Sequence, residues 1–432
     1  MRQARRASAP KTPARRHPDR RLVSVIMLFF FSAFLLISLK EEIHWQGLSL
    51  AVVVPVLIYI ATLWLPRFFP ADKLLLAIAN FLCALGVLIL YSTDQGAGTS
   101  RGLQQAVYYG VGIGVMLFCI LLVRYIHRWK FIIILIMGGA AILLALPLAI
   151  GTEQNGATNW INIAGTSLQP SEIVKIALLL ILSYYLSERR FLPWFLFAVF
   201  SLGILMLQRD LGTALIYYAT TLFLFYSSTG NLPLTGLGIL GGGGAAYLGY
   251  VMFAHVKKRV AIWRNPWIYY ETSGYQIVQM LMAIASGGLF GVGLGLGAPR
   301  VIPVYFTDCI FAVICEQFGI LFGILVLVMY VILILRGTSI ATSARSSFHS
   351  LLAMGCTVML GVQTFVIIGG VLKLIPLTGV TMPFVSYGGT SMVSCMGIIG
   401  LLQGVASINQ DDLAYDYEIS HSLQEEDMLP EA

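Results

Sequence analysis

Asp308 is the residue of this sequence that we consider best placed to do chemistry. It comes immediately before an apolar segment at 309–335, and Glu316 follows eight residues later on roughly the same helical face. A carboxylate among apolar neighbours tends toward a raised pKa, and a general base works best when its pKa lies near ambient pH. Asp308 is therefore our candidate for a catalytic base, and the alternative is that it only caps the helix.

Glu172 and Lys175 are a second pair of ionisable residues beside an apolar segment. They are three residues apart, so they share a helical face and can form an ion pair. Pro170 and Ser171 suit the start of a helix, and a negative Glu172 in its first turn suits the helix dipole. Charges at such positions cost several kcal/mol on insertion scales, on the order of 3. We favour a pair that shapes a polar cavity; the alternative is a pair that only holds the helix bundle together.

Three further polar segments accompany these carboxylates. The hairpin at 208–210 separates two apolar segments, and Asp210 either caps the next helix or serves the same site. The long segment 256–308 is rich in glycine and basic residues, which predicts backbone that lines a cavity and cations that bind either phosphate or lipid head groups. Paired glycines within 376–391 let the backbone approach a ligand, and the alternative is a kinked or late-starting helix that packs on its neighbours. The candidate substrate-binding residues are Glu172, Lys175, Trp160, Gln208, Asp210, Lys257, Lys258, Arg259, Arg300, Thr307, Ser386, Tyr387, Gly388 and Gly389.

Apolar helices must position all of these residues. Of the 432 residues, 58% are apolar and 11% are charged, with a mean hydropathy of +0.84. A soluble protein carries about 25% charged residues, so the composition excludes a water-soluble enzyme. Apolar blocks of about 17–25 residues can cross the membrane as helices. We predict an all-α polytopic membrane protein with about twelve transmembrane helices, near 22–38, 47–66, 74–92, 106–123, 131–150, 171–187, 191–207, 211–228, 232–255, 309–335, 350–372 and 381–406.

The distribution of Lys and Arg predicts the orientation of these helices. A cytoplasmic N-terminus places 17 of the 27 basic residues on the inner side, including eight in the tail 1–21. Both termini are then cytoplasmic. Four polar clusters lie outside: the segment 155–175 with Glu172 and Lys175, the hairpin that begins at Gln208, the long loop 256–308 that ends at Asp308, and the segment 376–391. The first apolar block is predicted to be a retained helix rather than a signal peptide. The acidic tail 411–432 is predicted to be solvated and disordered.

Several kinds of site are not indicated by the sequence. The six cysteines and six histidines show no metal-ligand spacing, and no phosphate-binding glycine motif of the nucleotide-dependent type occurs. We also find no nucleic-acid module, because the basic tail beside a first span more simply fixes topology and contacts anionic lipid.

The polar clusters together resemble the SEDS family (shape, elongation, division and sporulation), which includes RodA, FtsW and SpoVE. The matching segments are NGATNWINI and QPSEIVK within 155–175, QRDLGTA at 208–214, GYQ and AIASGGLFGVGLG within 274–295, IPVYFTDCIFAVICEQFG at 302–319 and IPLTGVTMPFVSYGGTS at 375–391. The resemblance covers roughly 74–408. It implies a ten-helix core at 67–410, with two additional N-terminal helices at 22–66.

The resemblance also implies an activity. Family members are peptidoglycan glycosyltransferases that polymerise lipid II into glycan strands at the outer face of the bacterial cytoplasmic membrane, for cell elongation, division or sporulation. Asp308 matches the essential acidic residue of the family, and Glu172 and Lys175 match its buried pair. The implied partners are lipid II, the undecaprenyl-diphosphate-linked glycan, membrane lipids and a class B penicillin-binding protein. No cofactor follows from the resemblance, and whether Mg²⁺ or Mn²⁺ takes part stays open.

The sequence departs from the family pattern at four positions. Asn159 replaces an Arg, Arg209 replaces a Pro, Cys309 replaces a Phe, and Gln317 replaces the second Glu of a pair. Two alternatives to an enzyme stay open. One is a lipid II flippase or transporter, and the other is a catalytically silent scaffold for a class B penicillin-binding protein, which the departures at Asn159 and Gln317 support.

Overall fold

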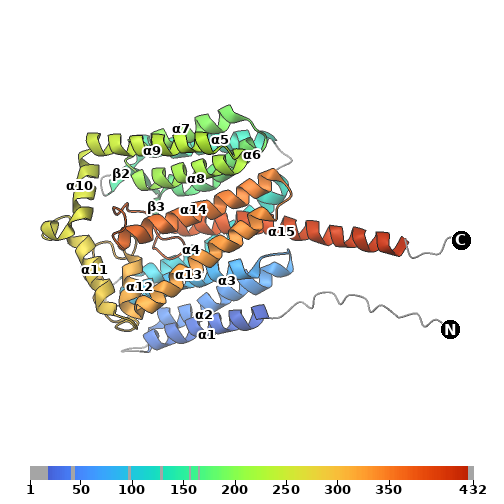
Figure 1. The fold of residues 1–432 in the computed structure, drawn as a ribbon. Coiled ribbons are helices and arrows are strands. Elements are labelled where there is room, and N and C mark those ends of the chain that lie inside the picture. Colours follow the sequence, from blue (N-terminus) through green and yellow to red (C-terminus); the bar gives the residue numbers. More distant parts are fainter. Residues whose placement is uncertain are drawn as a thin grey trace, which may run out of the picture.

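The computed structural model shows a bundle of long helices with a small sheet and several short helices at one end (Figure 1). It describes residues 18–39, 44–95, 99–126, 130–154, 157–163 and 166–426. The first described helix begins, and the last one ends, at the opposite end of the bundle from the sheet. Most of the basic N-terminal tail and residues 427–432 lie outside the described residues.

The helices and strands follow one another along the chain as long helices interrupted by two irregular regions. The long helices are α1 (Pro18–Ser38), α2 (Trp45–Tyr59), α3 (Lys73–Asp94), α4 (Arg101–Ile126), α5 (Lys130–Ile150), α6 (Pro170–Ser187), α7 (Phe191–Leu207), α8 (Leu211–Thr229), α9 (Leu232–Met252), α13 (Ile320–Thr342), α14 (Ser347–Val371) and α15 (Gly389–Glu426). The strands β1 (Thr152–Gln154), β2 (Ala157–Ile163) and β3 (Thr166–Leu168) form an antiparallel sheet in that order. The short helices are α10 (Ala254–Arg264), α11 (Tyr275–Gly287) and α12 (Ile310–Phe318).

Nine helices within the described ranges are by themselves long and apolar enough to cross a membrane, so the chain is a multi-pass membrane protein. The number rises to ten if α9 and the helix after it, which meet at a 96° bend, form one span. By length and apolar composition, the described residues therefore contain fewer than the twelve predicted transmembrane helices. α7 is apolar but has only 17 residues, and α8 does not meet the criterion.

Two predicted spans begin later than the hydropathy pattern suggested. The segment 309–335 is divided at Gly319, which has φ +84° and separates α12 from α13. The segment 381–406 becomes helical only at Gly389. A hydropathy window averages over such breaks, because it registers apolar side chains and not the backbone conformation that a glycine permits.

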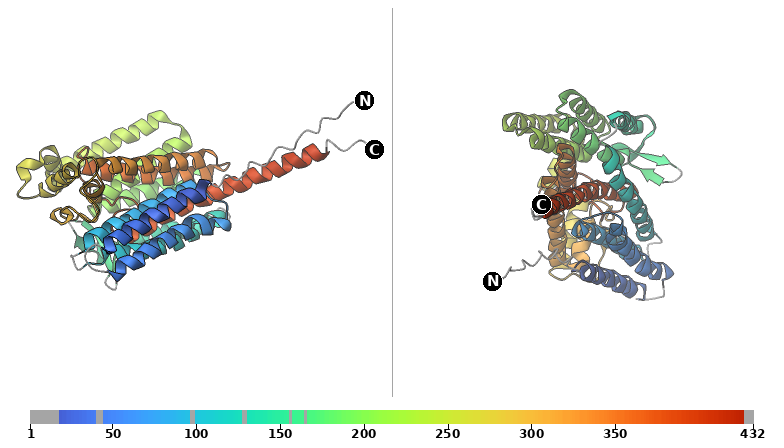
Figure 2. Two further views of the ribbon diagram at one scale, coloured as in Figure 1. Left: turned by 90° about the horizontal axis from the view of Figure 1, so that it is seen from below. Right: turned by 90° about the vertical axis from the view of Figure 1, so that its right-hand side faces the viewer.

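The acidic C-terminal segment is helical as far as Glu426, so the prediction of disorder from residue 411 is wrong over this range. α15 continues beyond the bundle (Figures 1 and 2). Its acids pair with basic residues of the bundle, Asp411 with Arg124 and Asp416 with Arg345. The helix is therefore anchored where it leaves the bundle.

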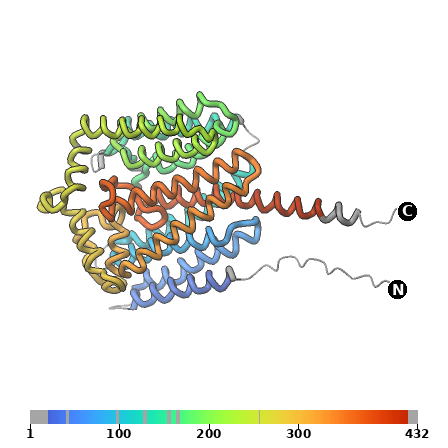
Figure 3. The backbone as a smooth tube through the Cα atoms, in the orientation of Figure 1, coloured from blue at the N-terminus to red at the C-terminus, as the bar shows by residue number. Residues whose placement is uncertain are grey.

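The N-terminal helices α1 and α2 pack on α3 at one side of the bundle, and α7, α8 and α9 lie at the other side (Figure 3). Buried hydrogen bonds join the N-terminal side to the core. Asn80 Nδ2 donates to Thr62 Oγ1 at 2.9 Å, and the Tyr109 hydroxyl donates to Asn80 Oδ1 at 2.7 Å. Because these groups are buried, each needs its partner, and the contacts fix α3 between its neighbours.

The segment predicted as a long loop at 256–308 consists largely of short helices. α10 and α11 lie across the end of the bundle that carries the sheet (Figure 1). The glycine-rich part wraps around the end of α12, where the amides of Val292 and Gly293 donate to the carbonyls of Glu316 and Gln317 at 2.9 and 3.1 Å. These short elements close the end of the bundle at which the polar clusters gather.

Candidate functional site

A cavity of about 980 Å³ lies where the sheet, α10 and the two loops before α12 and α15 meet. It brings together residues far apart in the sequence. The residues that line it are Gln104, Tyr108, Ala157, Asn159, Trp160, Ser167, Gln169, Glu172, Arg209, Asp210, Leu211, Thr213, Lys258, Arg259, Ile262, Ser273, Gln276, Ile277, Val304, Phe306, Thr307, Asp308, Leu377, Thr378, Gly379, Val380, Thr381, Tyr387, Gly388 and Gly389. All four polar clusters of the sequence contribute to this wall.

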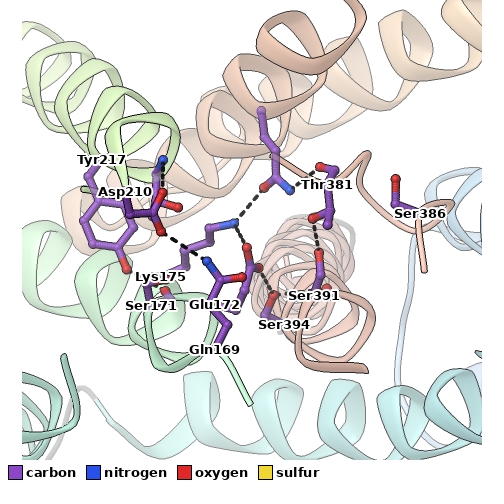
Figure 4. A network of polar contacts seen from close by, with 12 residues as sticks. Gln169, Ser171, Glu172, Lys175, Asp210, Tyr217, Thr381, Ser386, Ser391 and Ser394 are labelled. Carbon is purple, nitrogen blue, oxygen red and sulfur yellow. Dashed lines mark hydrogen bonds and ion pairs between the residues drawn. The ribbon is translucent and has the colours of Figure 1, made fainter. Parts of the chain in front are cut away.

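The predicted ion pair of Glu172 and Lys175 is present and forms the centre of a buried network (Figure 4). Lys175 Nζ donates to Glu172 Oε1 at 2.7 Å and to Gln363 Oε1 at 2.9 Å. Glu172 Oε2 accepts from the Ser394 hydroxyl at 2.9 Å, and Gln363 Nε2 donates to the Thr381 carbonyl at 2.9 Å. A buried charge is tolerated when its hydrogen-bonding capacity is used in this way. The network thus joins α6, α14 and α15 to the loop that begins at the end of α14.

Glu172 and Lys175 contribute to the cavity differently. Glu172 lines it, whereas Lys175 lies behind it with its side chain only 1% exposed. The start of α6 is set by Pro170, as predicted, and the Tyr217 hydroxyl donates to the Ser171 carbonyl at 2.7 Å. Both interpretations of the Glu172–Lys175 pair are compatible with its position, because the pair shapes the cavity wall and also joins three helices.

Asp210 caps α8 and also lines the cavity, so its two sequence interpretations are not exclusive. Its Oδ1 accepts from the amide of Thr213 at 3.0 Å. Its Oδ2 accepts from Asn159 Nδ2 at 2.7 Å and from Gln169 Nε2 at 3.1 Å. Asn159, one of the departures from the family pattern, thus binds the carboxylate through a neutral amide.

Asp308 is a half-buried residue of the cavity wall, held by contacts between two loops. The Ser386 hydroxyl donates to the Thr307 carbonyl at 2.6 Å, and the Tyr387 amide donates to the Phe306 carbonyl at 2.8 Å. These bonds fix the loop before α12 against the loop before α15. The Asp308 carboxylate therefore lines the cavity from a loop whose backbone is held by hydrogen bonds.

The start of α4 supports the same loop from the other side. The guanidinium of Arg101 lies 4.0 Å from the ring centroid of Phe306 and donates to the Tyr305 hydroxyl at 3.0 Å. The Tyr387 hydroxyl donates to Gln104 Oε1 at 2.5 Å. These contacts add a third element to the support of the catalytic candidate.

Burial raises the pKa of the Asp308 carboxyl from 3.8 to about 6. A hydrogen bond from Thr307 and the positive charge of Arg259 oppose this rise. Asp308 lies outside the helices that span the membrane. A carboxyl group with this pKa is largely ionised at neutral pH and is a stronger base than an ordinary Asp, which suits proton abstraction.

The predicted cations separate into two groups. Lys258 and Arg259 line the cavity, and Arg259 also donates to the Thr378 carbonyl at 3.3 Å. Lys257 is not among the lining residues, and Arg300 binds the carbonyls of Thr93 and Gln95 at the end of α3. The structure therefore brings only two of the four predicted cations to the cavity.

The remaining predicted residues are also divided between wall and support. Trp160, Thr307, Tyr387, Gly388 and Gly389 line the cavity. Gln208 is buried, with its Nε2 donating to the Leu144 carbonyl at 2.6 Å, and Ser386 is buried between two loops. Glu316 is not among the lining residues, and its Oε1 accepts from the amide of Ala298 at 3.0 Å.

Sequence reasoning missed several polar residues that the structure places in or behind the wall. Gln104 and Tyr108 lie near the start of an apolar helix, and Gln363 is a single amide within another. Arg209, which departs from the family pattern, also lines the cavity. A glutamine inside an apolar segment is a signal that could have identified Gln363, since such groups need buried partners.

Within the described ranges, no group of three or more His, Cys, Asp or Glu side chains is placed to hold a metal ion. The three carboxylates of the wall have different partners: Lys175 for Glu172, the amide of Thr213 for Asp210, and Thr307 for Asp308.

The fold and the cavity define a polytopic helical membrane protein with a polar site at one end of its bundle. A sequence model for the cell cycle proteins of the FtsW, RodA and SpoVE type matches residues 72–411. The chain belongs to this family, and the predicted SEDS membership is confirmed.

Individual relatives match over most of their length. The peptidoglycan glycosyltransferase RodA of Mycobacterium tuberculosis (strain ATCC 25618 / H37Rv) is 32% identical over 439 residues, which cover 94% of this chain and 93% of the relative. Stage V sporulation protein E of Bacillus subtilis (strain 168) is 32% identical over 356 residues, which cover 78% of this chain and 96% of the relative.

Two solved structures share the fold. The rod shape determining protein RodA of Thermus thermophilus aligns with a TM-score of 0.58 and 26% identity, over 79% of this chain and 98% of that one. A chain from a structure titled for the coordination of polymerization and crosslinking by a peptidoglycan synthase complex aligns with a TM-score of 0.65 and 26% identity, over 79% and 98%.

Proposed function

We propose that this chain is a peptidoglycan glycosyltransferase that polymerises lipid II into glycan strands. The observation that carries the proposal is Asp308, a carboxylate with a raised pKa on the wall of a 980 Å³ polar cavity, in a chain whose relatives are named for this activity. The cavity volume lies at the upper end of the range of about 300–1,000 Å³ that is typical of ligand pockets.

In the proposed reaction, the 4-hydroxyl of the acceptor N-acetylglucosamine attacks C1 of the N-acetylmuramic acid at the reducing end of the growing strand. Asp308 takes the hydroxyl proton as the new O4–C1 bond forms. The bond from C1 to the phosphate oxygen breaks, and undecaprenyl diphosphate leaves. General base catalysis of this kind contributes about 10²–10⁴-fold.

Cations beside the leaving group stabilise the charge that develops on it. Lys258 and Arg259 are the predicted candidates that the cavity contains. Arg259 has two roles in this proposal, because its charge also lowers the pKa of Asp308 and so keeps the base ionised.

We propose twelve crossings, with both termini in the cytoplasm and the cavity at the outer face. α7 and α8 run alongside the longer helices (Figure 1), which supports counting them as spans. The described ends of α1 and α15 lie at the end opposite the cavity. Arg67, Arg124 and Arg345 lie toward that same end, in agreement with the preference of basic residues for the cytoplasmic side.

A class B penicillin-binding protein is the proposed partner, because the structure with the higher TM-score belongs to a complex that coordinates polymerisation with crosslinking. The proposed role covers elongation, division or sporulation, since relatives of each kind match.

The test is reconstitution of the purified chain in vesicles with lipid II, with and without a class B partner and with and without Mg²⁺ or Mn²⁺. Glycan ladders on a gel are the expected result. Movement of labelled lipid II between leaflets, with no ladder under any of these conditions, would refute the enzyme and favour a flippase.

A further inference from the structure

Arg209 combines a cavity-facing side chain with an unfavourable backbone conformation. The residue follows the end of α7 with φ +61°. The amides of Arg209 and Asp210 donate to the carbonyls of Met206 and Leu205 at 3.1 and 3.0 Å, which is the hydrogen-bond pattern that ends a helix with a left-handed residue. Glycine is usual at this position because a β-carbon there is crowded. A residue type that is strained by its backbone conformation at a site is a reason to look for a role of its side chain.

The Arg209 side chain is exposed and lines the cavity. It forms no hydrogen bond or ion pair with any residue in the described part of the chain. Among the described residues, the neighbouring carboxylate of Asp210 forms no ion pair with this guanidinium, and it accepts hydrogen bonds from Thr213, Asn159 and Gln169 instead. Lys258 lines the same cavity, so a second positive charge is present. The guanidinium is therefore available to an anion from outside the protein.

Arg209 also lies beside an exposed apolar surface. Leu207 and Met206, at the end of the apolar helix α7, are 68% and 39% exposed. In a membrane these side chains face lipid. An anion that reaches Arg209 from this direction would be attached to an apolar chain, and a guanidinium can bind two phosphate oxygens at once.

We propose that Arg209 binds the diphosphate of a polyprenyl-diphosphate-linked substrate at the point where its polyprenyl chain enters the bilayer. The choice of a polyprenyl diphosphate rests on the proposed function, and a phospholipid phosphate is the other membrane anion with the same chemistry. Arg209 is then a substrate-binding residue and takes no part in proton transfer.

The chain contains a matched control at Arg189. This residue follows the end of α6 with φ +55°, and the amides of Arg189 and Arg190 donate to the carbonyls of Leu186 and Tyr185 at 3.1 and 2.9 Å. Its helix end therefore has the same geometry as that of Arg209, but Arg189 does not line the cavity. Substitution by glycine relieves the same backbone strain at both positions and removes a cavity cation at only one.

The experiment measures the affinity of the full chain for farnesyl diphosphate in nanodiscs of zwitterionic lipid, for wild type, Arg209→Gly and Arg189→Gly. We expect Arg209→Gly to weaken binding about tenfold or more, as for the loss of a charge-assisted contact. Arg189→Gly should bind as wild type does. Both variants should have midpoints of thermal unfolding equal to or above that of wild type.

Three results would overturn the inference. One is equal affinity of wild type and Arg209→Gly for farnesyl diphosphate. Another is an equal loss of affinity for farnesol, which carries no phosphate. The third is an effect of Arg209→Gly that appears only when phosphatidylglycerol is added to the nanodiscs, which would assign the residue to phospholipid.

The binding measurement requires no polymerisation, so the two proposals can fail separately. A chain that binds the diphosphate through Arg209 and makes no glycan from lipid II would refute the proposed function alone. A chain that makes glycan and binds the diphosphate without Arg209 would refute this inference alone.

Discussion

Replacing Lys175 with Met removes the positive partner of a buried carboxylate. The side chains of Lys175 and Glu172 are 1% and 3% exposed, and Lys175 Nζ lies 2.7 Å from Glu172 Oε1. Breaking such a pair in a soluble protein costs about 3–5 kcal/mol, because the remaining charge is left without compensation. In a membrane the unfolded state also finds polar partners, which lowers measured contributions of buried polar contacts to about 0.6–1.7 kcal/mol. We therefore expect Lys175→Met to lower the free energy of unfolding by about 2–3 kcal/mol, between these two ranges.

The assay is reversible unfolding in mixed micelles, followed by circular dichroism during titration with dodecyl sulfate. Lys257→Met is the control, because Lys257 is exposed and outside the cavity wall, and its loss should change the free energy by less than about 0.5 kcal/mol. The double variant Glu172→Gln/Lys175→Met should be more stable than Lys175→Met, because it leaves no unpaired charge. A free energy of unfolding of Lys175→Met within about 0.5 kcal/mol of the wild-type value, the range expected for surface substitutions, would refute the reasoning.

Two further predictions concern the catalytic carboxylate and the buried network around Lys175. Arg259→Gln removes the charge that lowers the pKa of Asp308, so the acidic limb of the profile of kcat/KM against pH should move to higher pH; an unchanged limb, as expected for Lys257→Gln, would contradict this. Gln363→Leu leaves the Thr381 carbonyl without its donor, and we expect a loss of stability of about 1–3 kcal/mol in the same unfolding titration. Wild-type stability of this variant would show that the bond contributes little.

The positions of most long helices could be predicted from the sequence, because each requires only a continuous apolar segment. The α15 extension could not, since Asp411 and Asp416 resemble a solvated tail until their partners Arg124 and Arg345 are brought near by the fold. The division at Gly319 depends on a backbone angle that a hydropathy average does not contain.

The site could be predicted in part for the same reasons. The spacing of Glu172 and Lys175 on one helix is local information, and their ion pair is present as predicted. Gln363 reaches Lys175 across 188 positions of the chain, and no local pattern records that contact. Arg300 appeared equivalent to Lys258 as a cation of the same segment, but the fold turns it toward carbonyls at the end of α3.

The initial rate of lipid II polymerisation by Asp308→Asn, compared with wild type in the same vesicles, tests the central claim most directly. The amide keeps the size of the side chain and cannot accept the proton as a carboxylate does. We expect the rate to fall by about 10²–10⁴-fold, with unfolding behaviour unchanged. A rate within about threefold of wild type would show that Asp308 is not the base and would contradict the proposed mechanism.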